Sequence, residues 1–233
     1  MHRNMIYIAD PGVNWKNLDG LNELAFMIKN AGADYIKPQL FETDSLYLKT
    51  HPYYSWIQAH QLSLQDAEEV FSYCEDINLK CIFSPFSIER ISWCKDIGIE
   101  KIKVANRMCT DLEFLNAIKE TGIPPIISVS KEKHLPYFTY DEIFGEDKYQ
   151  LLYVVSKYPA QITDYSLSAI ARCNGLSDHT DNICLSVAAS TACDFIERHV
   201  WYRNYSSPDM VCSLHTEQFK NMVDVCNDVS AIR

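Results

Sequence analysis

Polar side chains recur near the carboxyl ends of apolar, strand-like segments of this sequence. The segments carry polar residues two positions apart, namely Lys37 and Gln39, Lys101 and Lys103, Ser128 and Ser130, and Ser177 and His179. Because side chains alternate between the two faces of a strand, the members of each pair point the same way. Amines and hydroxyls gathered in this manner bind a phosphate or a carboxylate. Any single lysine can instead extend into solvent, and Lys101, at the start of its segment, is the weaker of its pair.

Two histidines end the last two strand-like segments. His179 follows GLSD, and His199 follows FIER. If these segments are neighbours in the fold, both imidazoles can reach one divalent cation and leave its other positions open to water and substrate. Two histidines with few carboxylates favour Mn²⁺ or Mg²⁺ over structural Zn²⁺. The remaining histidines fit no such pattern and are expected to be surface or packing residues: His2, His51, His60, His134 and His215. Lys131 and Lys133, beyond Ser130, are expected to be solvated loop charges.

Two aspartates stand near the same predicted rim. Asp10 ends the first strand-like segment, directly before Pro11 and Gly12. Its carboxylate can serve as a general acid or base, and it can equally cap the following turn. Asp209, in the later segment SPDM, is open to both interpretations.

The elements that must position these groups form a series of strand and helix pairs. Apolar β-rich runs alternate with segments whose apolar residues have helical spacing, and Ser63 with Asp66 predicts a capping box. The runs cover residues 5–10, 35–41, 81–86, 101–105, 125–130, 151–156, 173–177 and 194–200. Eight such units predict an α/β fold of the TIM (β/α)8 barrel type, with residues 1–233 as a single domain. An open doubly wound sheet is the alternative, but no GxGxxG motif follows the first run and no linker divides the chain.

The composition excludes several classes of partner. The net charge is −10 and no block of Lys or Arg occurs, so neither nucleic acid nor a membrane is expected as a partner. The chain has nine cysteines without a CxxC pair, as in reduced proteins where thiols pack as small apolar groups. No signal-peptide pattern opens the sequence, which favours a cytoplasmic location.

An ordered series of motifs resembles the sialic acid synthase family along nearly the whole chain. The motifs are IADPGVNW, GADYIKPQ, LSLQDAEEVFSYC, IFSPF, KIKVA, IISVS, SKYP, GLSDHT, FIERHV and PDMVCSL. The resemblance implies condensation of phosphoenolpyruvate with an aldose such as N-acetylmannosamine, giving a nonulosonic acid and phosphate. It further implies that the phosphoenolpyruvate ligands are Lys37, Ser84, Lys103, Ser128 and Ser177. Gln39 and Tyr158 match positions near the substrates, His179 and His199 match the two metal ligands, and Asp209 matches an aspartate on the acceptor sugar. Asp10 stands where the family has Glu and is a candidate for handling the proton of the attacking water.

The departures from the family pattern concern the acceptor. Trp15 replaces a histidine, and Met108 stands where a sugar-binding glutamate is expected. Asn106 replaces a serine and Ser156 replaces an asparagine, so both keep polar side chains in the predicted substrate-binding set, and Arg107 could supply new contacts. The family also appends an antifreeze-like domain after the barrel, which implies a homodimer or a separate partner chain here. A non-catalytic barrel subunit of polysaccharide biosynthesis and a metal-assisted aldolase remain as alternative functions.

Overall fold

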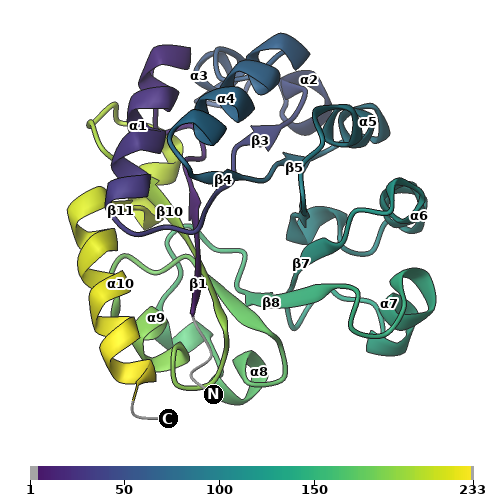
Figure 1. Ribbon diagram of the computed structural model, residues 1–233, viewed down its shortest axis with the longest axis vertical. Helices are drawn as coiled ribbons and strands as arrows, with labels where there is room; N and C mark the ends of the chain where they lie inside the picture. Colours follow the sequence, from purple (N-terminus) through teal and green to yellow (C-terminus); the bar gives the residue numbers. More distant parts are fainter. Residues whose placement is uncertain (1–4, 232–233) are drawn as a thin grey trace.

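Parallel strands form the centre of the molecule and helices surround them (Figure 1). The computed structural model describes residues 5–231. The strands are β1 (Ile6–Asp10), β2 (Tyr35–Ile36), β3 (Gln39–Leu40), β4 (Lys80–Cys81), β5 (Ser84–Pro85), β6 (Ile102–Val104), β7 (Pro125–Val129), β8 (Gln150–Val154), β9 (Gly175–Asp178), β10 (Phe195–Trp201) and β11 (Leu214–His215). All strand pairings between these elements are parallel, as a series of strand and helix units requires.

The sheet closes on itself, which confirms the predicted TIM barrel. Its strands follow the order β4, β2, β1, β10, β9, β8, β7 and β6. A bridge between Phe83 and Ile102 joins the two ends of this series. The predicted strand at 35–41 is split into β2 and β3 around Lys37 and Pro38, since proline has no N–H to give to a ladder. The strand predicted at 81–86 is likewise split into β4 and β5, so each pair fills one barrel position.

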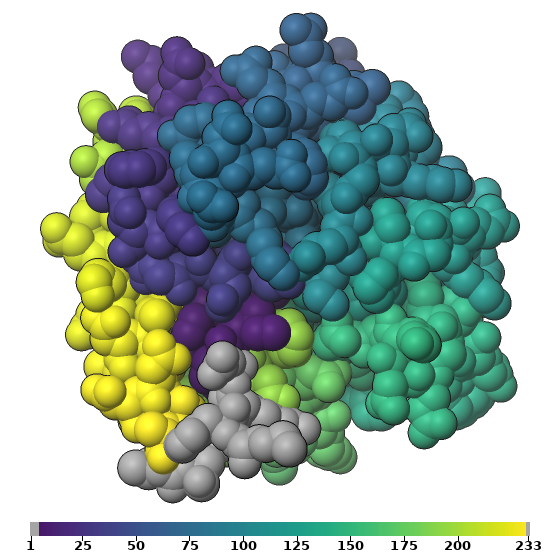
Figure 2. Space-filling model, in the orientation of Figure 1, coloured from purple at the N-terminus to yellow at the C-terminus, as the bar shows by residue number. Residues whose placement is uncertain are grey.

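Helices of very different length cover the outside of the barrel. They are α1 (Leu18–Asn30), α2 (Thr43–Leu46), α3 (Tyr54–Gln58), α4 (Leu64–Asp76), α5 (Ile88–Ile97), α6 (Leu112–Thr121), α7 (Tyr137–Phe144), α8 (Leu167–Ile170), α9 (Cys184–Ala189) and α10 (Thr216–Ser230), with 3-10 turns η1 (Asn106–Met108), η2 (Ile162–Asp164) and η3 (Pro208–Cys212). The predicted capping box of Ser63 and Asp66 begins α4. The C-terminal α10 lies beside the N-terminal part of the chain (Figure 2). Among residues 5–231, no helix has both the length and the apolar character that a membrane crossing would need.

The barrel interior is apolar at one end and polar at the other. The apolar layer consists of Ile8, Tyr35, Ile82, Ile126, Leu152 and Phe195. Two positions further along the same strands or strand ends stand Asp10, Lys37, Ser84, Ser128, Val154 and Glu197, which line a pocket. The alternation of side chains therefore places a packed layer directly beneath the polar groups and holds them at the carboxyl ends of the strands.

A buried ion pair on the outer face of the barrel joins β9 to β10. Asp178 Oδ2 lies 2.5 Å from Arg198 Nη1, and both side chains are fully buried. Arg198 also donates to the carbonyl oxygens of Thr180 at 2.6 Å and Asn182 at 3.0 Å. Because Arg198 lies between Glu197 and His199, the pair fixes the strand that carries these two residues into the pocket.

Removal of Asp178 is expected to destabilise the fold strongly. Asp178→Ala leaves the guanidinium of Arg198 buried without its carboxylate, a change that costs about 3–5 kcal/mol. Urea unfolding followed by circular dichroism measures the loss. Asp224→Ala is the matched control, since Asp224 pairs with Lys220 at the surface and such pairs contribute about 0–1 kcal/mol. Similar losses in the two variants would contradict this role of the buried pair.

Candidate active site

A pocket of about 500 Å³ opens at the carboxyl ends of the barrel strands. The sequence-predicted site residues all line it, although they come from widely separated parts of the chain. They are Asp10, Lys37, Gln39, Ser84, Lys103, Asn106, Ser128, Ser156, Tyr158, Ser177, His179, His199 and Asp209. Their convergence is what a common binding site requires.

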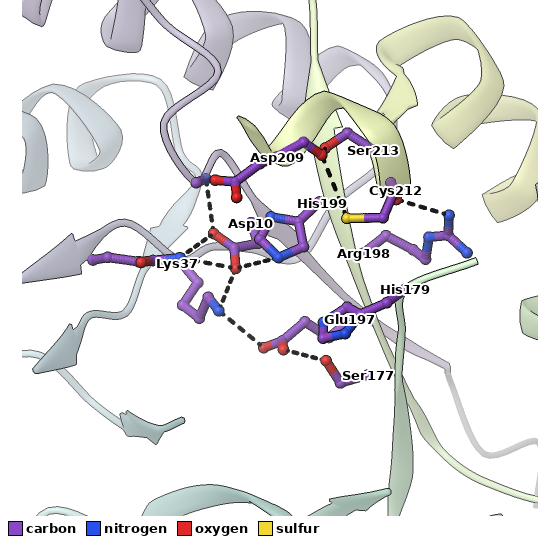
Figure 3. A network of polar contacts seen from close by, with 12 residues as sticks. Asp10, Lys37, Ser177, His179, Glu197, Arg198, His199, Asp209, Cys212 and Ser213 are labelled. Atoms are coloured by element: carbon purple, nitrogen blue, oxygen red, sulfur yellow. Dashed lines mark hydrogen bonds and ion pairs between the residues drawn. The ribbon is translucent and has the colours of Figure 1, made fainter. Parts of the chain in front are cut away.

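The floor of the pocket holds four ionisable groups of alternating charge, Asp10, Lys37, Glu197 and Lys103, of which the first three are labelled in Figure 3. Lys37 Nζ lies 2.5 Å from Asp10 Oδ2 and 3.7 Å from Glu197 Oε2. Lys103 Nζ lies 3.7 Å from Glu197 Oε1 and donates a hydrogen bond of 2.6 Å to Ser128 Oγ. Ser177 Oγ donates to Glu197 Oε1 at 2.8 Å. Two amines and two carboxylates, all of them buried, therefore balance one another.

Sequence reasoning overlooked Glu197, which lies at the centre of this network. The signal was present, because Glu197 stands two positions before His199 in the same strand and must point to the same side. The residue is 4% exposed and its carboxylate contacts both buried lysines, so it sets the charge balance of the floor.

The pKa values of the floor groups reflect burial first and then their neighbours. Burial opposes ionisation of Asp10, but His199 and Lys37 outweigh it and lower the pKa of Asp10 to about 2. Burial lowers the pKa of Lys103 to about 8, although Glu197 acts in the opposite direction. At Lys37 the burial effect is overcome by Asp10 and Glu197, which raise the pKa. Glu197 is also buried, yet Lys103 and Lys37 lower its pKa. At neutral pH the two carboxylates are thus ionised and the two amines protonated.

Several polar atoms that face the pocket lack a hydrogen-bond partner among the described residues. They include Ser84 Oγ, Glu197 Oε2 and His199 Nδ1, all buried. Buried polar atoms in native proteins are nearly always bonded, and exceptions mark places where water, an ion or a ligand belongs. The three atoms come from different strands and bound this pocket, as a ligand-binding site would.

His179 and His199 lie side by side at the ends of β9 and β10. Their ring centres are 5.5 Å apart, and the ring of Tyr158 stacks on His179 at 4.4 Å. His179 Nδ1 lies 3.0 Å from the carbonyl oxygen of Val155, which accepts its proton and leaves Nε2 with a free lone pair. Burial and then the neighbouring His199 lower the pKa of His179 to about 3, so the ring is neutral at pH 7.

The histidine pair fits an open metal site in which the protein supplies two imidazoles. Neutral imidazole nitrogen is a common metal ligand, and a backbone carbonyl on the other nitrogen is the usual way of fixing the ring. Across residues 5–231, no group of three or more His, Cys, Asp or Glu side chains is arranged to hold a metal ion.

Asp209 reaches the pocket because Gly12 has no side chain. Asp209 Oδ2 accepts a hydrogen bond of 2.9 Å from the backbone N–H of Val13. A Cβ atom at position 12 would lie 2.2 Å from the same oxygen and 3.1 Å from Nδ1 of His199, and the φ angle there is +47°. Gly12 therefore supplies both the left-handed backbone and the space for this contact.

The four positions at which the sequence departs from the family pattern divide into two groups. Asn106 and Ser156 line the pocket and bond each other, with Ser156 Oγ donating to Asn106 Oδ1 at 3.0 Å. Trp15 instead is buried beside the pocket wall, where its Nε1 donates to the carbonyl oxygen of Gly12 at 3.0 Å. Met108 packs against the apolar core. Neither Trp15 nor Met108 belongs to the pocket lining.

Four of the sequence expectations about individual residues can be judged. Ser130 was expected to point with Ser128 but is absent from the pocket lining, since its Oγ accepts from the backbone N–H of Lys133 in a turn. Lys133 was expected to be a solvated loop charge and His51 a surface or packing residue, and both line the pocket. Lys101 lies away from the pocket lining and bonds Gln150 at 3.4 Å, as its place at the strand start predicts. His2 lies outside the described residues.

Comparison with known proteins places this architecture in a family. The NeuB family matches residues 26–233. The chain is 25% identical to the N,N'-diacetyllegionaminic acid synthase of Legionella pneumophila, across 97% of this chain and 72% of that protein. It is 28% identical to a pseudaminic acid synthase of Campylobacter jejuni, across 84% of this chain and 65% of that protein. The chain thus spans about two thirds to three quarters of the length of these relatives.

The fold agrees with a solved structure of a related kind. An N-acetylneuraminic acid synthetase from Leptospira borgpetersenii superposes with a TM-score of 0.92 at 21% identity, across 99% of this chain and 85% of that one. At this identity the likeness supports the fold alone. The family match, by contrast, extends over most of the sequence, including every strand end that lines the pocket except the first. The chain belongs to the NeuB family.

Proposed function

We propose that the protein condenses phosphoenolpyruvate with an aldose to form a nonulosonic-type sugar acid and release phosphate. The observation that carries the proposal is the convergence of Lys37, Lys103 and three serines on the floor of one pocket, beside the pair of histidines. The donor has a phosphate and a carboxylate, and this floor offers amine and hydroxyl groups to both. The names of the relatives, which are acid synthases, support an enzyme of this class.

The proposed roles follow from the chemistry of the reaction. The enol carbon of phosphoenolpyruvate forms a bond to the aldehyde carbon, and the aldehyde oxygen takes up a proton. Water then adds to the resulting carbocation, at the carbon that carries the phosphate, and loses a proton. Phosphate leaves as this carbon becomes a ketone. Asp10 is ionised at neutral pH and is suited to orient the water and receive its proton. Lys37 stabilises the carboxylate of Asp10.

His179 and His199 would hold the divalent cation, Mn²⁺ or Mg²⁺. A cation bound there would polarise the aldehyde of the acceptor as a Lewis acid. Tyr158 stacks on His179 and would keep the ring in place. Gln39, Asn106, Ser156 and Asp209 would bind the substrates. A homodimer or a separate antifreeze-like chain, implied by the family resemblance, stays a prediction.

Phosphate release tests the proposal directly. Purified protein with Mn²⁺, phosphoenolpyruvate and a panel of aldoses is expected to release phosphate over many turnovers, with one sugar acid formed per phosphate. Omission of the aldose is the control for simple hydrolysis. Tight binding of phosphoenolpyruvate without turnover for any aldose would favour a non-catalytic barrel instead. Formation of pyruvate and aldose from a keto-acid, without phosphate, would favour an aldolase.

The affinity for phosphoenolpyruvate is expected to decrease above about pH 8. Lys103, whose pKa is lowered from 10.5 to about 8, is protonated below this value and neutral above it. An anion binds the protonated amine more tightly, so affinity falls by up to about tenfold per pH unit as the proton is lost. The pKa of Lys37 is raised, and a phosphate monoester is already doubly ionised at pH 8, so neither adds to the decrease. Calorimetric titrations with phosphoenolpyruvate from pH 6.5 to 9.5 measure this decrease. A constant affinity over that range would contradict the role of the protonated Lys103 in binding the anion.

A further inference from the structure

The loop between β8 and α8 surrounds His179. This residue follows the last residue of β9, and both ladders of β9 end before it, the one with β8 at Ser177 and the one with β10 at Asp178. The strand pairing of the barrel therefore does not fix the backbone of His179. The contacts that hold it come from residues 155–165, which we call the histidine loop.

Hydrogen bonds tie both the backbone and the ring of His179 to the histidine loop. Its backbone N–H donates to Tyr165 Oη at 3.0 Å, and its carbonyl oxygen accepts from the backbone N–H of Ala160 at 2.9 Å. On the side chain, Nδ1 lies 3.0 Å from the carbonyl oxygen of Val155, and the ring of Tyr158 stacks on the imidazole. The bond to Tyr165 can be removed by a side-chain substitution that leaves His179 itself unchanged.

The hydroxyl group of Tyr165 serves two backbone groups at the end of β9. Besides accepting from His179, Tyr165 Oη donates to the carbonyl oxygen of Ser177 at 3.4 Å. A tyrosine hydroxyl can both donate and accept, so here it takes the place of a neighbouring strand. The ring of Tyr165 packs against the apolar core, with its centre 6.2 Å from that of Tyr153 in β8. The packed ring thus holds the hydroxyl at the strand end.

The histidine loop is closed by one of its own acidic residues. Asp164 Oδ1 lies 2.5 Å from Lys157 Nζ, and Asp164 Oδ2 accepts from the backbone N–H of Gln161 at 2.9 Å. These bonds give the segment a defined shape between β8 and α8. A support of defined shape is what a metal ligand needs, because the ligand must be held in its productive orientation before the metal binds.

We propose that Tyr165 is a positioning residue of the histidine pair, whose hydroxyl group holds the end of β9 so that His179 presents Nε2 to the divalent cation. The inference rests on the proposed function, in which His179 and His199 hold that cation. Groups that orient a metal ligand affect metal affinity by about 10- to 100-fold although they do not touch the metal. Within residues 5–231 the pocket lining does not include Tyr165, so its effect can reach the cation only through the strand end.

Tyr165→Phe tests the inference, and Tyr140→Phe is the matched control. Phenylalanine keeps the packed ring and removes the hydroxyl group. Tyr140 makes the same kind of bridge under the neighbouring loop, where its hydroxyl accepts from the backbone N–H of Leu135 at 3.2 Å and donates to the carbonyl oxygen of Cys109 at 2.9 Å. Tyr140 is not part of the pocket lining either. The two variants therefore lose equivalent bonds, one pair at His179 and one pair away from it.

Mn²⁺ binding gives the first readout. Calorimetry with Mn²⁺ alone is expected to show an affinity about tenfold or more lower in Tyr165→Phe and unchanged in Tyr140→Phe. The affinity for phosphoenolpyruvate without metal should be unaltered in both, because Ser177 keeps its bond to Glu197. Equal losses of Mn²⁺ affinity in the two variants, or no loss in Tyr165→Phe, would overturn the inference. An equal loss of phosphoenolpyruvate affinity in Tyr165→Phe would show a general disturbance of the pocket and overturn it as well.

The ring of His179 gives a second readout that needs neither metal nor substrate. Nitrogen-15 NMR distinguishes a ring protonated at Nδ1 from one protonated at Nε2, and His179→Ala identifies the signals. In the unaltered protein the proton is expected on Nδ1, where the carbonyl oxygen of Val155 accepts it. In Tyr165→Phe the two forms should be mixed. Unchanged ring signals in this variant would mean that Tyr165 does not act through His179, and the inference would fail.

The same variants separate this inference from the proposed condensation. If no aldose supports phosphate release, but Tyr165→Phe binds Mn²⁺ more weakly than Tyr140→Phe and its His179 signals are mixed, the condensation fails and the positioning role stands. If phosphate is released and the two variants bind Mn²⁺ equally, the positioning role fails and the condensation stands. Absence of Mn²⁺ binding by the unaltered protein overturns the inference, whatever the outcome for phosphate release.

Discussion

Lys103→Met is expected to weaken the binding of phosphoenolpyruvate by about 1–3 kcal/mol or more, which is roughly 5- to 150-fold in affinity. The substitution keeps an unbranched apolar side chain in the buried position and removes the ammonium group. Ser128 loses its donor, and Glu197 keeps only Lys37 as a basic partner. Isothermal titration calorimetry with phosphoenolpyruvate at pH 7 measures the loss, and the decrease of affinity above pH 8 should disappear in this variant.

Lys101→Met is the matched control for Lys103. The two lysines are two positions apart at the same strand, but Lys101 bonds Gln150 away from the pocket lining. Its replacement should leave the affinity for phosphoenolpyruvate unchanged. Thermal unfolding of both variants checks that the barrel is intact. If Lys103→Met binds as tightly as the unaltered protein, or if both variants lose the same affinity, the assignment of Lys103 to the donor is wrong.

His179→Ala is expected to lower metal-dependent turnover by more than about 100-fold, because even the groups that merely support a metal ligand affect activity by about 10- to 100-fold. The neutral ring, fixed by the carbonyl oxygen of Val155, is the proposed ligand, and alanine leaves His199 alone. Phosphate release measured over a Mn²⁺ titration gives the effect on turnover. Calorimetry with Mn²⁺ alone gives a second readout that does not depend on catalysis.

His134→Ala serves as the control for loss of a histidine. His134 is exposed in the loop before α7 and does not line the pocket. The His134→Ala variant should bind Mn²⁺ and turn over as the unaltered protein does. Full Mn²⁺ binding by His179→Ala would remove the histidine pair from the proposed metal site, whatever its effect on turnover.

The barrel could be predicted because its signals are local. Apolar strands that alternate with helical periodicity identify the units, and their number identifies the barrel. The polar floor could be predicted for the same reason, since alternation along each strand decides which side chains face inward. Lys37 and Lys103 were found in this way. Glu197 is accessible to the same reasoning, since it stands two positions before His199 in β10.

The mouth of the pocket could not be predicted by this reasoning. Arg107, Lys133 and His51 lie in irregular segments, where no period relates a residue to the inside of the barrel. Their place in the lining depends on how the loops after different strands pack against one another. The turn that holds Ser130 away from the pocket depends on a bond to Lys133, which the strand pattern does not contain. Tertiary packing therefore decides the rim, whereas the strand period decides the floor.

The ladder between β1 and β10 joins the first strand of the barrel to the last long one and sets Asp10 opposite His199. The charged floor draws on both sides of this junction, with Asp10 and Lys37 near the start of the chain and Glu197 near its end. No fragment that contains only one side can assemble the anion-binding groups. Recognition of the substrate is thus a property of the completed ring, in which the first strand and the last long strand lie side by side.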